Sequence, residues 1–119
     1  MVGLHNIVGT LVVLAYLVLT VVNVLRARGS DLPWARNLSF AAAGLLLIQY
    51  LLGFWLLGDG HRNQAAHYVF ALLAIVTVGL EHGYAQTRVT QSARATTALA
   101  ATAATFILVV IAYSIGQSS

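Results

Sequence analysis

Four histidines carry the metal-binding chemistry that this sequence offers. They are His5, His61, His67 and His82, and the chain contains no cysteine. An imidazole can ligate a metal ion, carry a proton or form a hydrogen bond with a neighbouring group. The absence of cysteine excludes thiolate metal sites, iron–sulfur clusters, haem attached through cysteine, and disulfides. Which role each histidine has depends on the elements that hold it.

Four long uncharged and mainly apolar runs make up most of the 119 residues. Only 8% of the residues are charged, whereas a soluble domain carries about 25%. Each bilayer crossing takes about 20 apolar residues and must be helical, because strands of an open sheet leave backbone groups unpaired in lipid. The sequence therefore predicts an all-α membrane protein: a single-domain, antiparallel up-down bundle of four transmembrane helices, at about residues 2–25, 35–58, 64–82 and 95–116.

The arginines predict the orientation in the membrane. Five of the six flank the first and third connections, and Arg62 alone marks the second. The positive-inside rule places the first and third connections in the cytoplasm. Both termini then lie outside the cytoplasm, and we expect the inner membrane of a prokaryote. The net charge of +3 comes from scattered arginines that suit topology and anionic lipid rather than nucleic acid.

Two of the histidines are expected to face one another. His5 lies near the outer end of the first predicted helix and His67 near the outer end of the third. Helices one and three of an up-down bundle lie diagonally across its core. Two imidazoles on that diagonal could ligate the iron of one haem from both sides. The sequence thus predicts His5 and His67 as metal ligands and haem b as the cofactor.

Small residues share the faces of these two histidines. At 100° per residue, Gly9 lies below His5, and Ala71 and Ala74 lie below His67. Such residues either leave room for a flat macrocycle or let helices pack closely, and spacing alone leaves both open. Gln49, the deepest strongly polar side chain of the second helix, is expected to form a hydrogen bond across helices or with a cofactor edge.

The other two histidines have simpler expected roles. His61 lies in a short polar turn, where solvation is the expected role. His82 ends the third predicted helix beside Glu81. An interfacial polar cap is the main expectation for it, and a second cofactor site or a proton relay with Glu81 is the alternative.

Three short segments resemble haem A synthase, a family with two four-helix halves. Leu4 and His5 open an apolar helix like that family's histidine-headed helices. Residues 47–53, Leu-Ile-Gln-Tyr-Leu-Leu-Gly, are similar to its glutamine-containing segment, and residues 67–73, His-Tyr-Val-Phe-Ala-Leu-Leu, to its next histidine-headed helix. The resemblance covers about residues 4–80 and implies one half, with His5 and His67 as axial ligands of one haem. The chain departs from the family in having a single half, Asn6 after His5 and no Glu-x-x-His-Arg motif, so it implies haem binding rather than haem A synthesis.

These observations lead us to expect a b-type haem electron-transfer protein, or a small haem-carrying subunit of a redox complex, rather than a stand-alone catalyst. Two alternatives remain: a non-redox accessory subunit of a respiratory or photosynthetic complex, and a chlorophyll-type pigment-binding subunit. We also expect a homo-oligomer or a larger membrane complex. Close contacts in it would use small residues of the fourth helix: Ala98, Ala101, Thr102 and Thr105.

Overall fold

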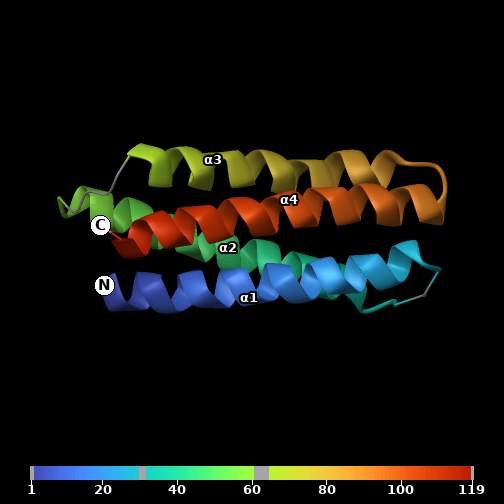
Figure 1. Ribbon diagram of the computed structural model, residues 1–119, viewed down its shortest axis with the longest axis horizontal. Helices are drawn as coiled ribbons and strands as arrows, with labels where there is room; N and C mark the ends of the chain where they lie inside the picture. The colour runs from blue at the N-terminus through green and yellow to red at the C-terminus, as the bar shows by residue number, and fades with distance from the viewer. Residues whose placement is uncertain (1, 30–31, 61–64, 119) are drawn as a thin grey trace.

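The computed structural model describes residues 2–29, 32–60 and 65–118. All regular structure in these ranges is helical. The elements are α1 (Val2–Ala27), α2 (Ala35–Gly58), α3 (Ala65–Gly79), a π-helical turn η1 (Leu80–Tyr84), a 3₁₀ turn η2 (Ala85–Thr87) and α4 (Gln91–Ser118). Together they form an elongated bundle of 47 × 20 × 20 Å (Figure 1).

Within the described residues, four helical segments are long and apolar enough to cross a membrane, as the sequence predicts. They are Gly3–Ala27, Ala35–Gly58, Ala65–Thr87 and Gln91–Gly116. The shortest has 23 residues, which at about 1.5 Å per residue exceeds the roughly 30 Å of a hydrocarbon core. In Figure 1 both chain ends lie at one end of the bundle, and the connection between α1 and α2 lies at the other.

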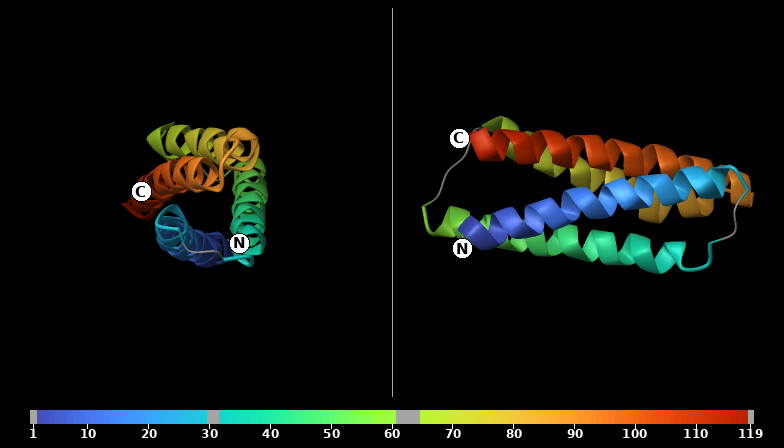
Figure 2. Two further views of the ribbon diagram at one scale, coloured as in Figure 1. Left: turned by 90° about the vertical axis from the view of Figure 1, so that its right-hand side faces the viewer. Right: turned by 60° about the horizontal axis from the view of Figure 1, so that its bottom comes forward.

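The helices pack as an incomplete ring. The α1 backbone lies close to α2 and α4, and α3 lies close to α4, whereas α2 and α3 stay further apart. Viewed along the bundle, α4 lies between α1 and α3, so these two occupy opposite corners (Figure 2, left). This geometry puts the His5 and His67 helices across the core from one another.

The helices begin and end where the local sequence requires it. After α1 the chain turns at Gly29 with φ of 104°, and after α2 at Gly60 with φ of 90°, a conformation that costs residues with a Cβ atom more than glycine. The Thr90 hydroxyl accepts a hydrogen bond of 3.0 Å from the Ala93 backbone N–H, as an N-cap residue does.

The third helical segment is longer than predicted. Its helical backbone continues past residue 82 through η1 and η2 to Thr87. The connection to the fourth helix is shorter than the predicted helix bounds of 64–82 and 95–116 imply, because α4 begins at Gln91. Polar residues are therefore part of the helical rod here, and they include the buried Glu81.

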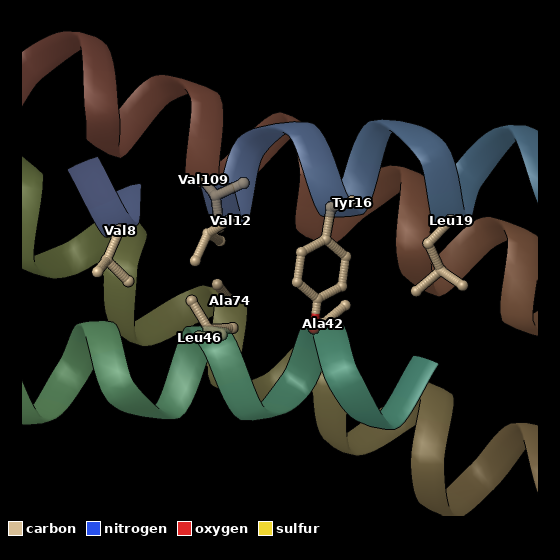
Figure 3. Packing of buried hydrophobic residues seen from close by; sticks show 8 residues of the cluster. All are labelled: Val8, Val12, Tyr16, Leu19, Ala42, Leu46, Ala74 and Val109. Carbon is tan, nitrogen blue, oxygen red and sulfur yellow. The ribbon is translucent and has the colours of Figure 1, made fainter. Parts of the chain in front are cut away.

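A narrow apolar core fills the middle of the bundle (Figure 3). Val12, Tyr16 and Leu19 of α1 are at most 2% exposed, and they pack with Ala42 and Leu46 of α2 and with single residues of α3 and α4. Their spacing of three and four residues gives α1 one continuous buried face. The larger apolar side chains mostly point outward, as Leu14, Leu51 and Val76 do.

Small residues of α4 take part in this interior packing. Ala98, Ala101, Thr102 and Thr105 are each at most 6% exposed. The sequence offered them as a surface for association with other chains, and that assignment is wrong, because α1 and α3 cover them within the same chain. Association itself stays a prediction, and it needs another surface.

Candidate cofactor-binding site

A cavity of about 550 Å³ lies between all four helices at the end of the bundle that holds the termini. Its volume falls within the roughly 300–1,000 Å³ usual for small-molecule and cofactor sites. Its lining is mainly apolar and aromatic and includes His5, Gln49, His67 and Tyr113. The structure thus brings together around one cavity the two histidines that the sequence predicts as ligands.

His67 projects from the first turns of α3 and is held by a neighbouring helix. Its Nδ1 atom lies 2.7 Å from the backbone carbonyl oxygen of Ala112 in α4. A carbonyl only accepts, so Nδ1 carries the proton and Nε2 has the free lone pair. Histidines that ligate metals are commonly oriented in this way, with one ring nitrogen donating to a carbonyl and the other binding the metal.

His5 reaches the same cavity from the first turns of α1. Its Nδ1 atom is buried and has no hydrogen-bond partner among the described residues, and the same holds for Oε1 of Gln49. Both residues line the cavity. Buried polar atoms without partners are uncommon in folded proteins and call for an explanation such as water, an ion or a bound group.

Two of the small residues border the cavity, and one does not. Gly9 and Ala71 belong to its lining, whereas Ala74 is fully buried in the apolar core. A Cβ atom added at Gly9 would lie 2.9 Å from Nε2 of Gln49 and 3.2 Å from Cδ2 of Tyr113. These two side chains pack directly over Gly9, so the glycine admits close packing at this level.

The second helix approaches His5 closely at Gly53. A Cβ atom built there would lie 3.5 Å from Cε1 of the His5 ring, an ordinary van der Waals distance. One turn earlier, the Tyr50 hydroxyl donates a hydrogen bond to the backbone carbonyl of Ala71 in α3. Tyr50 therefore joins α2 to α3 along the wall of the cavity. These two neighbouring helices lack the close backbone approach of the other neighbouring pairs.

His82 does not join this site. His82 lies in η1, away from the cavity, with its Nε2 atom 3.6 Å from Oε1 of Glu81. His61, for which we expect a solvated role, lies outside the described residues.

Sequence reasoning named Gln49 of α2, which lines the cavity, but missed the other contributions of α2 and α4 to the site. The Ala112 carbonyl that orients His67 belongs to the backbone, so no residue type in the sequence indicates this contact. Nothing in a single tyrosine's position in the sequence distinguishes a packing or interfacial role from a hydrogen bond across helices, such as the one Tyr50 donates to Ala71.

No protein-family model, no curated protein and no solved structure matches the chain.

Proposed function

We propose that this chain is an integral membrane protein that binds haem b between His5 and His67 and transfers electrons. The observation that carries the proposal is the pair of histidines on one cavity, with Nδ1 of His67 already engaged by Ala112. A bis-histidine site leaves no open coordination position, which favours electron transfer over oxygen chemistry. Haem would supply reversible one-electron exchange at its iron.

The residues around the cavity fit such a group. Among the described residues no set of three histidine, aspartate, glutamate or cysteine side chains could hold a metal ion. A tetrapyrrole needs fewer protein ligands than a bare ion, because its own nitrogens occupy four positions, and two histidines complete the rest. Oε1 of Gln49 and Nδ1 of His5 have no partner among the described residues, and they would supply an acceptor and a donor beside the site. The surrounding apolar and aromatic side chains would exclude water from the iron.

The membrane assignment rests on length, composition and surface. All four spans meet the requirements for crossing, and large apolar side chains such as Leu51, Phe54 and Val76 are more than half exposed. In water such an exposed apolar surface would drive association, whereas in a bilayer it contacts the hydrocarbon chains of the lipids favourably. We propose an up-down-up-down arrangement with both termini outside the cytoplasm, since the arginines concentrate at the other end.

The first test is the visible absorption spectrum of the purified protein, oxidised and reduced, with haem content measured per chain. We expect a six-coordinate, low-spin b-type spectrum. The His67→Ala variant should lose the haem or bind it far more weakly, because the ligand and its link to α4 are lost together. The His5→Ala variant should do likewise or give a five-coordinate haem that binds carbon monoxide.

His82→Ala is the matched control, since it removes an imidazole from the same helical rod but not from the cavity. Its haem content should equal that of the unchanged protein. Full haem content in both the His5 and His67 variants would refute the axial pair. A protein that purifies colourless and does not take up added haem would favour the accessory-subunit alternative.

A further inference from the structure

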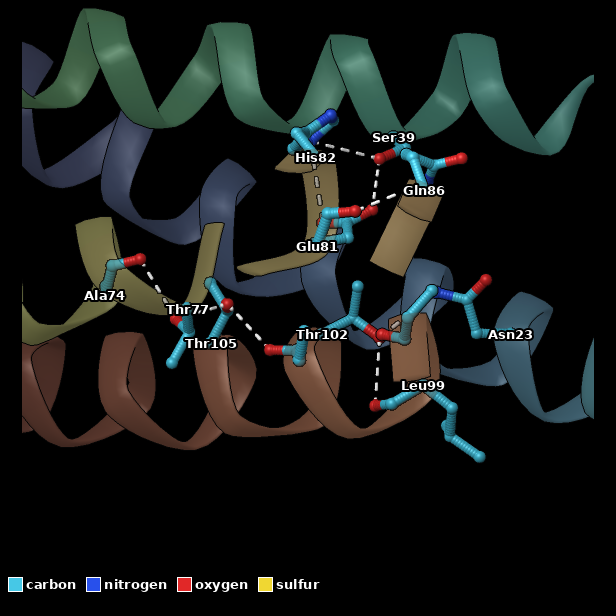
Figure 4. Close-up of polar contacts among 12 residues, drawn as sticks. Asn23, Ser39, Ala74, Thr77, Glu81, His82, Gln86, Leu99, Thr102 and Thr105 are labelled. Atoms are coloured by element: carbon cyan, nitrogen blue, oxygen red, sulfur yellow. Dashed lines mark hydrogen bonds and ion pairs between the residues drawn. The ribbon is translucent and has the colours of Figure 1, made fainter. Parts of the chain in front are cut away.

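A second polar cluster contains Ser39, Glu81 and His82 (Figure 4), and none of these residues lines the cavity. At its centre is Glu81, which is 3% exposed and is the only glutamate in the chain. It is 14 residues beyond His67 on the same helical rod, which corresponds to about 20 Å at 1.5 Å per residue. It lies in the π-helical turn η1, a type of turn that is rare and often marks functional sites.

The Glu81 carboxyl group has two neighbours that can exchange protons. The Ser39 hydroxyl of α2 donates a hydrogen bond to Oε2. The Nε2 atom of His82 lies 3.2 Å from the Ser39 hydroxyl oxygen and 3.6 Å from Oε1 of Glu81. Oε1 itself is buried and has no hydrogen-bond partner among the described residues. One carboxyl oxygen is therefore held in place, while the other is available to a proton.

Positive charge near this group is directed elsewhere. On α1, Arg26 donates a 2.9 Å hydrogen bond to Oδ1 of Asn23, whose amide in turn donates to Thr102 of α4. On α2, the Arg36 guanidinium lies 5.5 Å from the centre of the Phe40 ring. In the parts of the chain that the structure describes, His82 is the sole group within ion-pair distance of Glu81.

The buried polar side chains of α1 and α4 are uncharged. The α1 side chain facing this region is Tyr16, whose buried hydroxyl has no partner within the described ranges. From α4 come the hydroxyls of Thr102 and Thr105, which donate to backbone carbonyls or to Thr77. Arg26 acts on Glu81 only from beyond ion-pair distance, and among the described residues no arginine contacts the carboxyl group. An ionised side chain inside a membrane bundle is costly unless it is compensated.

We propose that Glu81 is a proton-binding site, whose carboxyl group takes up and releases a proton through His82. On uptake, a proton passes from water to Nδ1 of the His82 ring, and Nε2 passes its own proton to Oε1 of Glu81. Release follows the same steps in reverse. Ser39 keeps the carboxyl group oriented throughout. No electron is transferred and no cofactor is required, so the proposal goes beyond haem binding and does not depend on it.

His82 is placed to connect this site with the surface. Its side chain is 22% exposed, whereas that of Glu81 is 4% exposed. Its ring packs 5.0 Å from that of Phe40, on which Arg36 lies. The route therefore leads toward the end of the bundle where the arginines concentrate.

Because Glu81 is the only glutamate in the sequence, isotope-labelled glutamate marks this side chain alone. The full-length protein in lipid is prepared with ¹³C-labelled glutamate, and infrared spectra are recorded over a pH series. We expect a carbonyl-stretch band of a protonated carboxylic acid that shifts on ¹³C labelling, shifts in D₂O, and is lost in one step on the alkaline side. The Glu81→Gln variant should lack the band, whereas the Asp59→Asn variant should retain it.

The route is tested by the rate at which the band shifts after transfer to D₂O. We expect His82→Ala to slow this exchange about 100-fold, the scale of a single positioned acid–base group, while the band itself remains. Circular dichroism verifies that each variant is folded. The proposal is overturned if labelled Glu81 shows no titrating band while the protein stays folded. It is also overturned if sodium changes the band at constant pH, which would indicate a cation site. An unchanged exchange rate in His82→Ala would refute the route through His82. None of these measurements depends on bound haem. Failure of the proton-binding proposal is therefore distinguishable from failure of the haem proposal.

Discussion

Asn23 joins α1 to α4, and its replacement gives the most quantitative prediction. The side chain is fully buried, its amide donates a 3.1 Å hydrogen bond to the Thr102 hydroxyl of α4, and its Oδ1 accepts a 2.9 Å bond from Arg26. The Asn23→Leu variant keeps a similar side-chain shape and removes both bonds. It therefore tests how much this polar contact stabilises the packing of α1 against α4.

The magnitude follows from the two bonds. A neutral hydrogen bond contributes about 1 kcal/mol, and the bond from the partly exposed Arg26, discounted for screening, about another 1 kcal/mol. Contacts between membrane helices average nearer 0.6 kcal/mol each. We expect Asn23→Leu to lower the free energy of unfolding by about 1–2 kcal/mol, or about 5- to 30-fold in the equilibrium constant.

The assay is unfolding in mixed micelles at increasing dodecyl sulfate, followed by circular dichroism. Thr20→Val is the control, because the Thr20 hydroxyl donates 2.7 Å to the Tyr16 carbonyl of its own helix and joins no second helix through that bond. A double-mutant cycle with Thr102→Val isolates the coupling between the two side chains. No loss of stability in Asn23→Leu, or a coupling of zero, would refute the reasoning.

Three further predictions concern other parts of the molecule. Tyr50→Phe removes the hydrogen bond to the Ala71 carbonyl and should cost about 0.6–1.7 kcal/mol in the same unfolding assay; an unchanged transition would show that this bond contributes nothing. Tags at both termini should be accessible from outside the cytoplasm, because five of the six arginines flank the first and third connections; protection of either tag in intact cells would contradict the topology. Light scattering in mild detergent should give more than one chain per particle, while a monomer that retains its haem would argue against association.

The sequence predicts the four helices well because each depends on a local property. A run of about 20 apolar residues can only be a helix in lipid, and the charged residues mark its ends. The inward faces follow for the same reason: Gly9 below His5 and Ala74 below His67 are both buried, as the 100° spacing predicts. Periodicity is a property of one helix and needs no knowledge of its neighbours.

Features that depend on two helices were not predictable in this way. The helical rod continues past residue 82 through η1, where Glu81 meets Ser39 of α2, a partner 42 residues away. The small residues of α4 fit an external or an internal contact equally well by composition. Only the packing of α1 and α3 against α4 decides between them.

The loosely packed side of the bundle connects these observations. Apolar burial does not hold helices together in lipid, so close backbone approach and polar contacts must do so. The α2 and α3 backbones lack the close approach seen at the other three interfaces. Two side-chain hydrogen bonds nevertheless join α2 to the third helical segment, from Tyr50 to Ala71 of α3 and from Ser39 to Glu81 of η1. The first lies on the wall of the cavity and the second at the buried carboxyl group. A ligand that binds only the folded bundle stabilises it, and more so the more tightly it binds. A group held by His5 of α1 and His67 of α3 would thus add a link between the two helices at opposite corners of the bundle.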